Sequence, residues 1–257
     1  MSAKILVKQV DQAVVTHLAE TFDLPHFIAA TLASRGVIQD EQVERFLHPS
    51  LVRDWRDPHD IEGMEEVIER LLAALKRSAR ILVFGDFDVD GITATSIMTR
   101  GLRALGAEVI PFIPLRFEEG YGLSAKAIER VIGLNPDLVI TVDNGIAASD
   151  EVEHLKREGI EVIITDHHEP AEAVPKGVPL IDPKCGNNPS SILAGAGVAL
   201  KAIQTLGARL GKPHLWRSLV DLATLGTIAD LMPMVDENRA LVAEGLTMLN
   251  SEPRACI

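Results

Sequence analysis

Apolar and polar positions change their period repeatedly along the middle of the chain. Five short apolar runs have the length of buried strands, and they lie at 81–84, 108–113, 138–142, 161–165 and 178–181. Patterns with apolar residues on one helical face separate them, at 92–105, 124–132 and 147–158. Strands that alternate with helices in this way form right-handed β-α-β units. The pattern therefore predicts an α/β fold with a mostly parallel, doubly wound sheet and helices on both faces.

Helical patterns flank this alternating region on both sides. Residues 1–75 predict a small N-terminal segment, helical and irregular, that packs on the core through an apolar stripe over 61–76. Three helical segments are predicted toward the C-terminus: 192–210, 215–230 and a third that begins after Glu237 and runs through Leu249. We accordingly assign 76–250 to one main domain, and we expect 251–257 to begin a connection to further domains.

The composition is that of an ordinary globular protein. Of the 257 residues, 47% are apolar and 24% are charged, and no apolar run approaches the roughly 18 residues needed to cross a bilayer. The N-terminal residues lack the apolar stretch of a secretory signal, so we expect a cytoplasmic protein without a membrane partner. The two cysteines, Cys185 and Cys256, form neither a disulfide framework nor a C-x-x-C zinc site.

Acidic residues follow one predicted strand after another. The candidate ligands stand at strand ends, with one more at a helix end, and they are Asp86, Asp88, Asp90, Asp143, Asp166, His167, His168 and Asp230. Because the carboxyl ends of parallel strands meet at one edge of a sheet, we expect these side chains to converge there. Ionised carboxylates packed this closely repel one another, so a folded protein keeps them together mainly when divalent cations bind between them.

The string D-x-D-x-D-G at 86–91 also occurs in the calcium-binding loops of EF-hands. In such a loop the twelfth position is a bidentate Glu, but here it is Ile97, and a strand precedes the string where a helix belongs. These two departures argue against an EF-hand. A solvated acidic turn is the structural alternative, because Asp is common in turns.

The mixture of donors indicates the kind of metal. Carboxylates with a minority of imidazoles suit Mn²⁺ or Mg²⁺, whereas zinc more often has thiolate or several His ligands. Seven or eight donors exceed what one ion needs and fit two ions about 3.5–4 Å apart. Such a pair lowers the pKa of a bridging water and neutralises charge on phosphate oxygens, so the predicted reaction is hydrolysis of a phosphate ester.

Several roles within this set stay open. We expect His167 to be a ligand and His168 to orient it, bind phosphate or donate a proton, although the reverse assignment also fits. Asp166 either takes part in the chemistry or only orients a neighbouring histidine. Asp90 either joins the site or caps the helix that begins after Gly91.

The acidic motif at 86–90, the Asp143 that ends a third strand and the later Asp166-His167-His168 resemble the DHH phosphoesterase superfamily. The resemblance is closer to its bacterial branch of single-strand-specific 5′ to 3′ exonucleases. The resemblance runs nearly from end to end, over LASRG at 32–36, FLHPSL at 46–51, FGDFDVDGITAT at 84–95, EEGYGLS at 118–124, VDNGI at 142–146, VIITDHH at 162–168, LAGAGVALK at 193–201, LGTIADLMP at 225–233 and ENRALVAEGL at 237–246. It makes 76–250 a DHH-type catalytic domain.

The resemblance implies a function as well as a fold. It implies an enzyme that uses two Mn²⁺ or Mg²⁺ ions and releases mononucleotides from the 5′ end of single-stranded DNA, in DNA repair and recombination. A single-strand-binding protein and a helicase are the further partners we expect. The implied metal ligands are Asp86, Asp88, Asp143, His167 and Asp230, with Asp90 and His168 close by.

Substrate contacts are expected from a loop over the strand ends and from helix termini. The candidates are Arg116, Tyr121, Gly195, Gly197, Lys201 and Arg239, the last two as phosphate contacts. Arg116 would hold a terminal phosphate while Tyr121 stacks on a base, the alternative being a solvated Arg and a packing Tyr. Gly195 and Gly197, at a helix start, let backbone N–H groups approach a phosphate or permit close helix packing.

The charge balance limits what the chain can grip alone. A net charge of −12 and only one Tyr, two Trp and seven Phe are unusual for a nucleic-acid binder, although two bound cations would return about four positive charges to the site. The family continues into a second domain and an oligonucleotide-binding fold, which we expect to complete the basic cleft. A phosphohydrolase for small substrates and a non-catalytic binding module are the alternative functions.

Overall fold

A five-stranded parallel sheet stands at the centre of the computed structural model, which describes residues 8–120, 122–170, 173–251 and 253–254. The strands lie in the order β2-β1-β3-β4-β5, and each neighbouring pair is parallel. Their bounds are β1 Arg80–Phe84, β2 Glu108–Phe112, β3 Leu138–Val142, β4 Glu161–Thr165 and β5 Leu180–Ile181. The predicted α/β class is confirmed, and every described strand is parallel where a mostly parallel sheet was expected.

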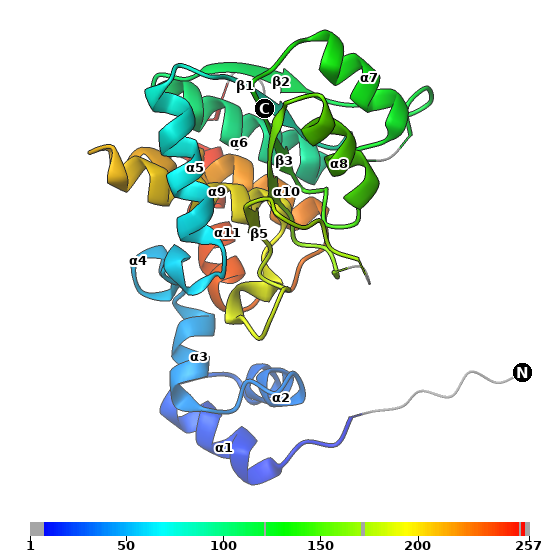
Figure 1. Ribbon diagram of the computed structural model, residues 1–257. Helices are drawn as coiled ribbons and strands as arrows, with labels where there is room; N and C mark the ends of the chain where they lie inside the picture. Colours follow the sequence, from blue (N-terminus) through cyan, green and yellow to red (C-terminus); the bar gives the residue numbers. More distant parts are fainter. Residues whose placement is uncertain (1–7, 121, 171–172, 252, 255–257) are drawn as a thin grey trace, which may run out of the picture.

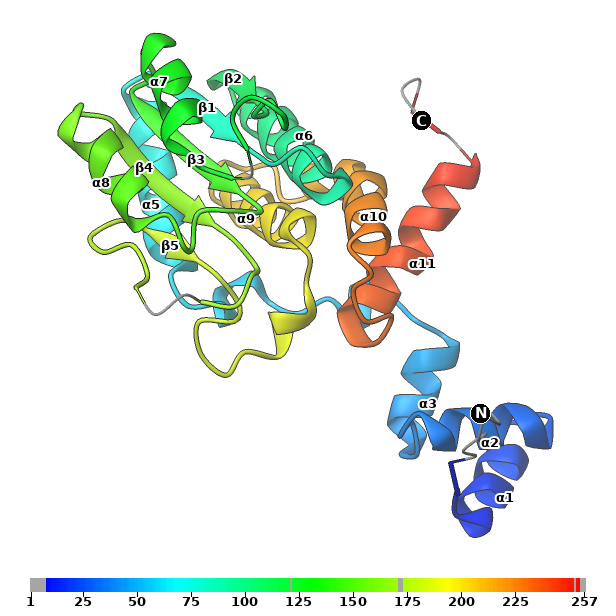
Figure 2. The same ribbon diagram turned by 90° about the vertical axis from the view of Figure 1, so that its right-hand side faces the viewer.

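Helices cover both faces of the sheet (Figure 1, Figure 2). One face carries α5 Met64–Lys76, α6 Val89–Ala104 and α9 Gly195–Arg209, and the other carries α7 Ala125–Gly133 and α8 Ser149–Arg157. Alternate residues of each strand enter opposite cores. In β1, Ile81 and Val83 join the α5, α6 and α9 side, while Leu82 and Phe84 join the α7 and α8 side. The sheet is therefore buried on both faces, as its continuous apolar runs predict.

Two further helices, α10 Val220–Ala229 and α11 Asp236–Ser251, extend the layer on the α6 and α9 side. The predicted helix at 215–230 is in fact a 3₁₀ turn, η3 Leu215–Leu219, followed by α10. The helix predicted from 92 begins three residues earlier, because the side chain of Asp88 accepts a hydrogen bond from the Gly91 N–H and caps it there. Among the described helices, none combines the length and apolar character that a bilayer crossing requires.

The N-terminal helices form a small unit below the α/β domain (Figure 1). It consists of α1 Gln12–Thr21, α2 His26–Ser34 and α3 Asp40–Leu47, which share an apolar core of their own. The next elements, α4 Leu51–Asp54 and η1 Pro58–Asp60, lead into α5. Since α5 buries its apolar face in the core of the sheet, only α1–α3 stand apart from the main domain.

A buried ion pair joins this layer to the chain ahead of α5. The ammonium of Lys201 on α9 lies 2.9 Å from Glu237 on α11, and both side chains are fully buried. It also donates to the carbonyl of Arg56 at 2.8 Å and sits 3.9 Å from the ring centroid of Trp55. The expectation that Lys201 contacts phosphate is therefore wrong, because its charge is enclosed and paired.

Arg239 also differs from its predicted role as a phosphate contact. Its guanidinium stacks 3.7 Å from the ring centroid of Phe46 and donates to the carbonyl of the same residue. Phe46 belongs to α3, whereas Arg239 belongs to α11. The Arg239 side chain links the N-terminal unit to the main domain, and its guanidinium is engaged with Phe46 instead of a phosphate site.

Removing the cation of the buried pair should destabilise the fold. In Lys201→Met the carboxylate of Glu237 stays buried without its partner, so we expect the free energy of unfolding to fall by about 3–5 kcal/mol. Urea denaturation measures the loss. The double variant Lys201→Met with Glu237→Met removes both charges and should recover most of it, whereas a single-variant loss below about 1 kcal/mol would contradict the assignment.

Candidate metal centre

The strand order reverses between β1 and β3, because the chain moves from β1 to β2 on one side and continues through β3 on the other. Open parallel sheets bind ligands at such a point, outside the carboxyl ends of the strands. Asp86, Asp143 and His167 follow β1, β3 and β4, which are adjacent strands. The sheet thus brings to one edge three candidate ligands that lie up to 81 positions apart in the sequence (167 − 86).

His167 is the centre of the cluster. Its Nε2 lies 2.9 Å from Asp143 Oδ1, 3.6 Å from Asp90 Oδ2 and 3.8 Å from Asp230 Oδ2. Asp90 comes from α6 and Asp230 is the C-terminal cap of α10. Two groups of three residues each offer ligand atoms that lie within 4.8 Å of one another inside the group. One group is Asp143, His167 and His168, and the other is Asp90, His167 and Asp230. The predicted arrival of Asp230 from a helix end agrees with this geometry.

Asp143 is held in a left-handed backbone conformation, with φ at 62°. Asp is among the few non-Gly residues that adopt it, at a cost of about 1–3 kcal/mol when the surroundings enforce it. Gly195 packs directly against this residue, since a Cβ there would lie 2.5 Å from the Asp143 Cβ. The N-terminus of α9 therefore approaches this carboxylate so closely that only glycine fits.

Asp166 fixes the two histidines that follow it. Its Oδ1 accepts the N–H of His167 at 2.7 Å and Nδ1 of His168 at 2.7 Å, and its Oδ2 accepts the N–H of Ile146 at 2.9 Å. Burial favours its neutral form, but the hydrogen bonds outweigh burial and lower its pKa. The bond to Asp166 raises the pKa of His168 to about 9. Of the two roles left open for Asp166, the geometry favours the orienting one.

Asp86 and Asp88 stand on the turn between β1 and α6. Asp86 is fully buried and accepts the N–H of Phe87 at 2.7 Å, whereas Asp88 is exposed and caps α6. Neither belongs to the two close groups around His167. The charge of Asp88 nevertheless contributes, after burial, to a raised pKa of Asp143, so it acts on the same site.

The residues fit a divalent cation. Burial, followed by the charge of Asp143, raises the pKa of Asp90 to about 8, and burial, followed by the charge of Asp88, raises that of Asp143 to about 8. Both shifts reflect how unfavourable these charges are together without a cation. Asp143 Oδ1 is buried within ion-pair distance of His167 but makes no hydrogen bond of suitable angle among the described residues. Carboxylates with imidazole are the donors that Mn²⁺ and Mg²⁺ accept.

The loop after β2 lies near the turn that carries Asp86 and Asp88. Arg116 is exposed, and its guanidinium lies 4.9 Å from the ring centroid of Phe87. This position is compatible with the predicted contact to a terminal phosphate, which stays a prediction. Tyr121, the predicted stacking partner, lies outside the described residues.

The two glycines of α9 serve packing. The N–H of Gly195 donates to Asp90 at 2.7 Å, so it is already bonded within the protein. At Gly197 a Cβ would lie 3.1 Å from the side chain of Leu193. Of the two alternatives for Gly195 and Gly197, close helix packing is the one that the structure supports.

Asp182 belongs to the surroundings of the site, although the sequence interpretation left it out. It follows β5 and is buried, and its Oδ1 accepts the N–H of Lys184 at 2.8 Å. Burial raises its pKa to about 6, the charge of Asp166 adds to the shift and that of His167 opposes it. The signal was available, because Asp182 is one more acid at the end of a predicted strand.

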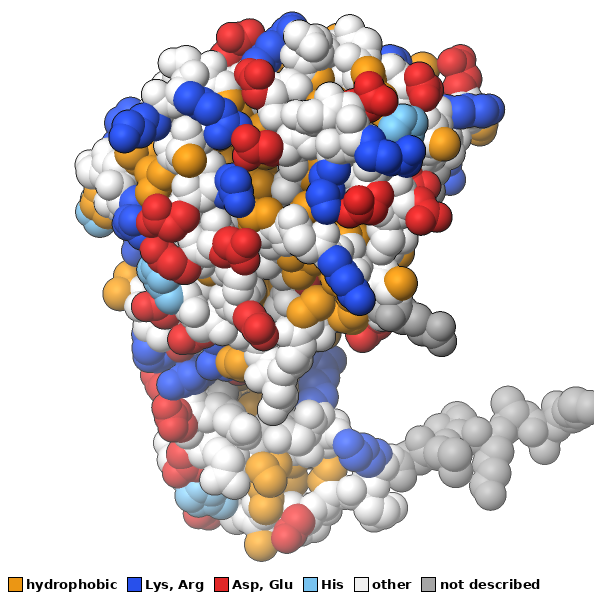
Figure 3. Space-filling model, in the orientation of Figure 1, with side chains coloured by type: hydrophobic (Ala, Val, Ile, Leu, Met, Phe, Trp, Pro, Cys, Tyr) orange, Lys and Arg blue, Asp and Glu red, His pale blue; other side chains and the backbone are white. Residues whose placement is uncertain are grey.

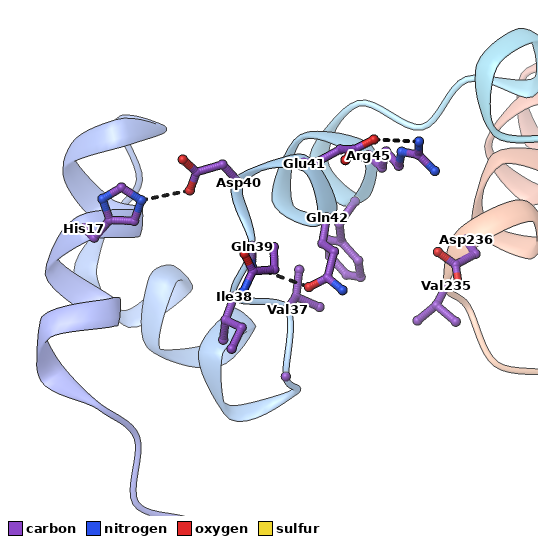
Figure 4. A pocket seen from close by; sticks show the side chains of 12 residues that line it. His17, Val37, Ile38, Gln39, Asp40, Glu41, Gln42, Arg45, Val235 and Asp236 are labelled. Carbon is purple, nitrogen blue, oxygen red and sulfur yellow. Dashed lines mark hydrogen bonds and ion pairs between the residues drawn. The ribbon is translucent and has the colours of Figure 1, made fainter.

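A cavity of about 1030 Å³ opens elsewhere, between α3 and the segment before α11 (Figure 4). Two pairs of its side chains contact each other, with His17 2.8 Å from Asp40 and Arg45 2.7 Å from Glu41. None of the close donor groups around His167 takes part in it. This cavity is therefore separate from the candidate metal centre.

The fold and the cluster define a class, namely α/β proteins with a divalent-cation site at the carboxyl edge of a parallel sheet. Residues 80–227 match the model of the DHH family, N-terminal domain, and the chain belongs to the DHH family. The match begins at the first residue of β1 and ends within α10, so it covers the strands that carry the site.

Proteins named single-stranded-DNA-specific exonuclease RecJ are similar to the chain. The one from Bacillus subtilis (strain 168) is 40% identical over 251 residues, which are 96% of this chain and 31% of that protein. The one from Thermus thermophilus is 44% identical over 192 residues, which are 74% of this chain and 28% of that protein. The chain thus spans about a third of the length of these relatives.

Two solved structures are similar as well. RecJ from Thermus thermophilus in complex with Mn²⁺ has a TM-score of 0.76 and 35% identity, over 94% of this chain and 34% of that one. An exonuclease RecJ bound to manganese has a TM-score of 0.70 and 42% identity, over 74% and 49%. The resemblance inferred from the motifs is confirmed by these matches.

Cation affinity should rise with pH. Because the pKa of Asp143 is raised to about 8, its carboxyl is protonated at lower pH and must lose that proton before it binds a cation. For one such proton, Mn²⁺ affinity should fall about tenfold per pH unit below that value. Isothermal titration calorimetry measures it, and Asp143→Asn serves as the control without the proton. An affinity that stays constant between about pH 6 and 8 would contradict this ionisation.

A methyl group at Gly195 should disturb the site. In Gly195→Ala the new Cβ would lie 2.5 Å from the Asp143 Cβ and 2.9 Å from its Cα, so α9 must move outward. We expect the free energy of unfolding to fall by about 1–3 kcal/mol. Gly133→Ala, where nothing lies within 4 Å of the new Cβ, is the matched control and should be neutral or slightly stabilising. Equal urea midpoints for both variants would refute the close approach.

Proposed function

We propose that this chain is the catalytic core of a two-metal phosphodiesterase that removes mononucleotides from the 5′ end of single-stranded DNA. The observation that carries the proposal is the cluster of Asp90, Asp143, Asp230 and His167 at the reversal point of a DHH-family sheet. The printed names of the RecJ relatives supply the substrate, and the Mn²⁺ and Mg²⁺ complexes of RecJ support the choice of cation.

The ligand set is the one that the motif resemblance implies, and three of its members, Asp143, His167 and Asp230, meet in the structure. We assign Asp86, Asp88, Asp143, His167 and Asp230 as ligands of Mn²⁺ or Mg²⁺. Cations held there supply a water of lowered pKa and positive charge for the phosphate oxygens. Asp166 holds His168 by a 2.7 Å hydrogen bond, and His168 is half-buried beside Asp143 and His167, where its ring would donate to a bound phosphate. Arg116 binds the terminal phosphate from the loop after β2.

The charge balance of the chain supports a weak grip on DNA by these residues alone. One face of the molecule, the one in Figure 3, has Lys and Arg side chains interspersed with Asp and Glu and shows no continuous basic stripe. The net charge is −12. A single strand needs a basic groove along several nucleotides. We therefore propose that the rest of the length found in the RecJ relatives provides this groove, and that a single-strand-binding protein and a helicase supply the strand.

Hydrolysis of labelled DNA tests the proposal. We expect a single-stranded oligonucleotide labelled at its 5′ end to release labelled mononucleotide with Mn²⁺ or Mg²⁺, slowly for residues 1–257 alone. His167→Ala and Asp143→Asn each remove a proposed metal ligand, and each should lower the rate by more than about 100-fold. Removing a residue that only hydrogen-bonds to a metal ligand typically costs about 10–100-fold, so the loss expected here is larger. Asp150→Asn changes an exposed acid on α8 and is the matched control with an unchanged rate.

Three comparisons separate the proposal from its alternatives. Duplex DNA of the same sequence, a dinucleotide and pyrophosphate are offered under the same conditions. Faster hydrolysis of pyrophosphate or the dinucleotide would make the chain a phosphohydrolase for small substrates. Release of a 3′ label first would contradict the polarity, and binding without any hydrolysis by the full-length protein would make the domain a binding module.

A further inference from the structure

The loop after β2 is closed on itself by one largely buried carboxylate. The side chain of Glu119 is 9% exposed. Its Oε2 accepts the N–H of Leu115 at 2.6 Å, so it bonds to the backbone four positions earlier in the same loop. The N–H of Glu119 in turn donates to the carbonyl of Leu115 at 2.8 Å. Residues 115–119 therefore form a closed turn, with Arg116 and Phe117 at its tip.

Arg130 of α7 fixes this turn to the body of the domain. Its Nη1 donates to both carboxylate oxygens of Glu119 at 2.9 Å, and its Nη2 donates to the carbonyl of Ile113 at 3.0 Å. Its guanidinium lies 4.0 Å from the ring centroid of Phe112, the last residue of β2. Such charge-assisted bonds fix geometry as well as distance. The ion pair of Glu119 and Arg130, which we call the clamp, thus ties the start and the end of the loop to α7.

The tip of the loop is held out from the protein beside the metal centre. Phe117 is 98% exposed. A mobile loop would gain free energy by turning such a ring onto neighbouring apolar surface, so its exposure indicates a backbone that is fixed at its base. The guanidinium of Arg116 lies 4.9 Å from the ring centroid of Phe87, which stands between Asp86 and Asp88. The clamp therefore presents Arg116 next to the turn that carries two of the proposed ligands.

We propose that Glu119 and Arg130 are positioning residues, which fix the loop so that Arg116 is in place for the terminal phosphate before the strand binds. A mobile loop would lose backbone freedom on binding, whereas a clamped loop has already lost it. The inference rests on the proposed function, which assigns the terminal phosphate to Arg116. Neither clamp residue belongs to the two donor groups around His167, so the clamp is separate from the cation ligands.

Kinetics with two strands that differ in one group test the clamp. Oligonucleotides of one sequence carry either a 5′ phosphate or a 5′ hydroxyl, and KM and kcat are measured with Mn²⁺. In Glu119→Ala the loop loses its clamp. The KM for the phosphorylated strand should then rise about tenfold at unchanged kcat, while the KM for the hydroxyl strand stays the same. Glu119→Gln keeps an acceptor for the Leu115 N–H and should recover part of the loss. Glu118→Ala removes the same charge from an exposed neighbour and is the matched control with an unchanged KM.

A double variant shows whether Glu119 acts through Arg116. If it does, Arg116→Ala with Glu119→Ala should raise the KM for the phosphorylated strand no more than Arg116→Ala alone. Additive losses would overturn the inference, as would an unchanged KM in Glu119→Ala when Arg116→Ala raises it. An unchanged KM in Arg116→Ala would remove the phosphate contact from the proposed function itself, and the role of the clamp with it.

Hydrogen exchange measures the clamp without DNA, metal or hydrolysis. Because the Leu115 N–H donates to Glu119, this amide should exchange faster in Glu119→Ala than in Glu118→Ala. Equal exchange in the two variants would show that the loop is held without Glu119. That result would overturn the inference whatever the nuclease activity of the protein.

Discussion

Carboxylates buried side by side at the point where the strand order reverses are the constraint on which this structure depends. Their charges are unfavourable in a low dielectric, as the raised pKa values of Asp90 and Asp143 indicate. The fold offsets part of the cost with backbone N–H groups, at α9 for Asp90 and at Ile146 for Asp166. The carboxylate charge that these N–H groups do not balance faces His167, and a bound cation would balance it.

The residues at the strand ends could be predicted from the sequence. The contacts that helix residues make with other elements could not. Short apolar runs followed by acids predicted which residues reach the sheet edge, and Asp143, His167 and Asp230 do meet. The prediction that Lys201 contacts phosphate was wrong because it assumed that a charged residue lies at the surface. Of the other positions in 198–206, all but Gln204 are buried and all but Gln204 and Thr205 are apolar, a pattern that already indicates a helix enclosed on most sides.

The same limit applies to the start of α9. A pair of glycines before an apolar helix predicts either a phosphate site or close packing, and the sequence pattern does not choose between them. The choice depends on Asp90, which is 105 positions away and belongs to a different helix. Its own motif favoured metal or local capping, so the contact that links the first acidic motif to the LAGAGVALK segment becomes visible only in three dimensions.

Anomalous diffraction from crystals of the protein grown with Mn²⁺ tests the central claim most directly. We predict two manganese peaks about 3.5–4 Å apart at the carboxyl edge of the sheet, with His167 and Asp143 among the ligands. A map without manganese at this edge, or one in which Asp230 points away from His167, would contradict the account.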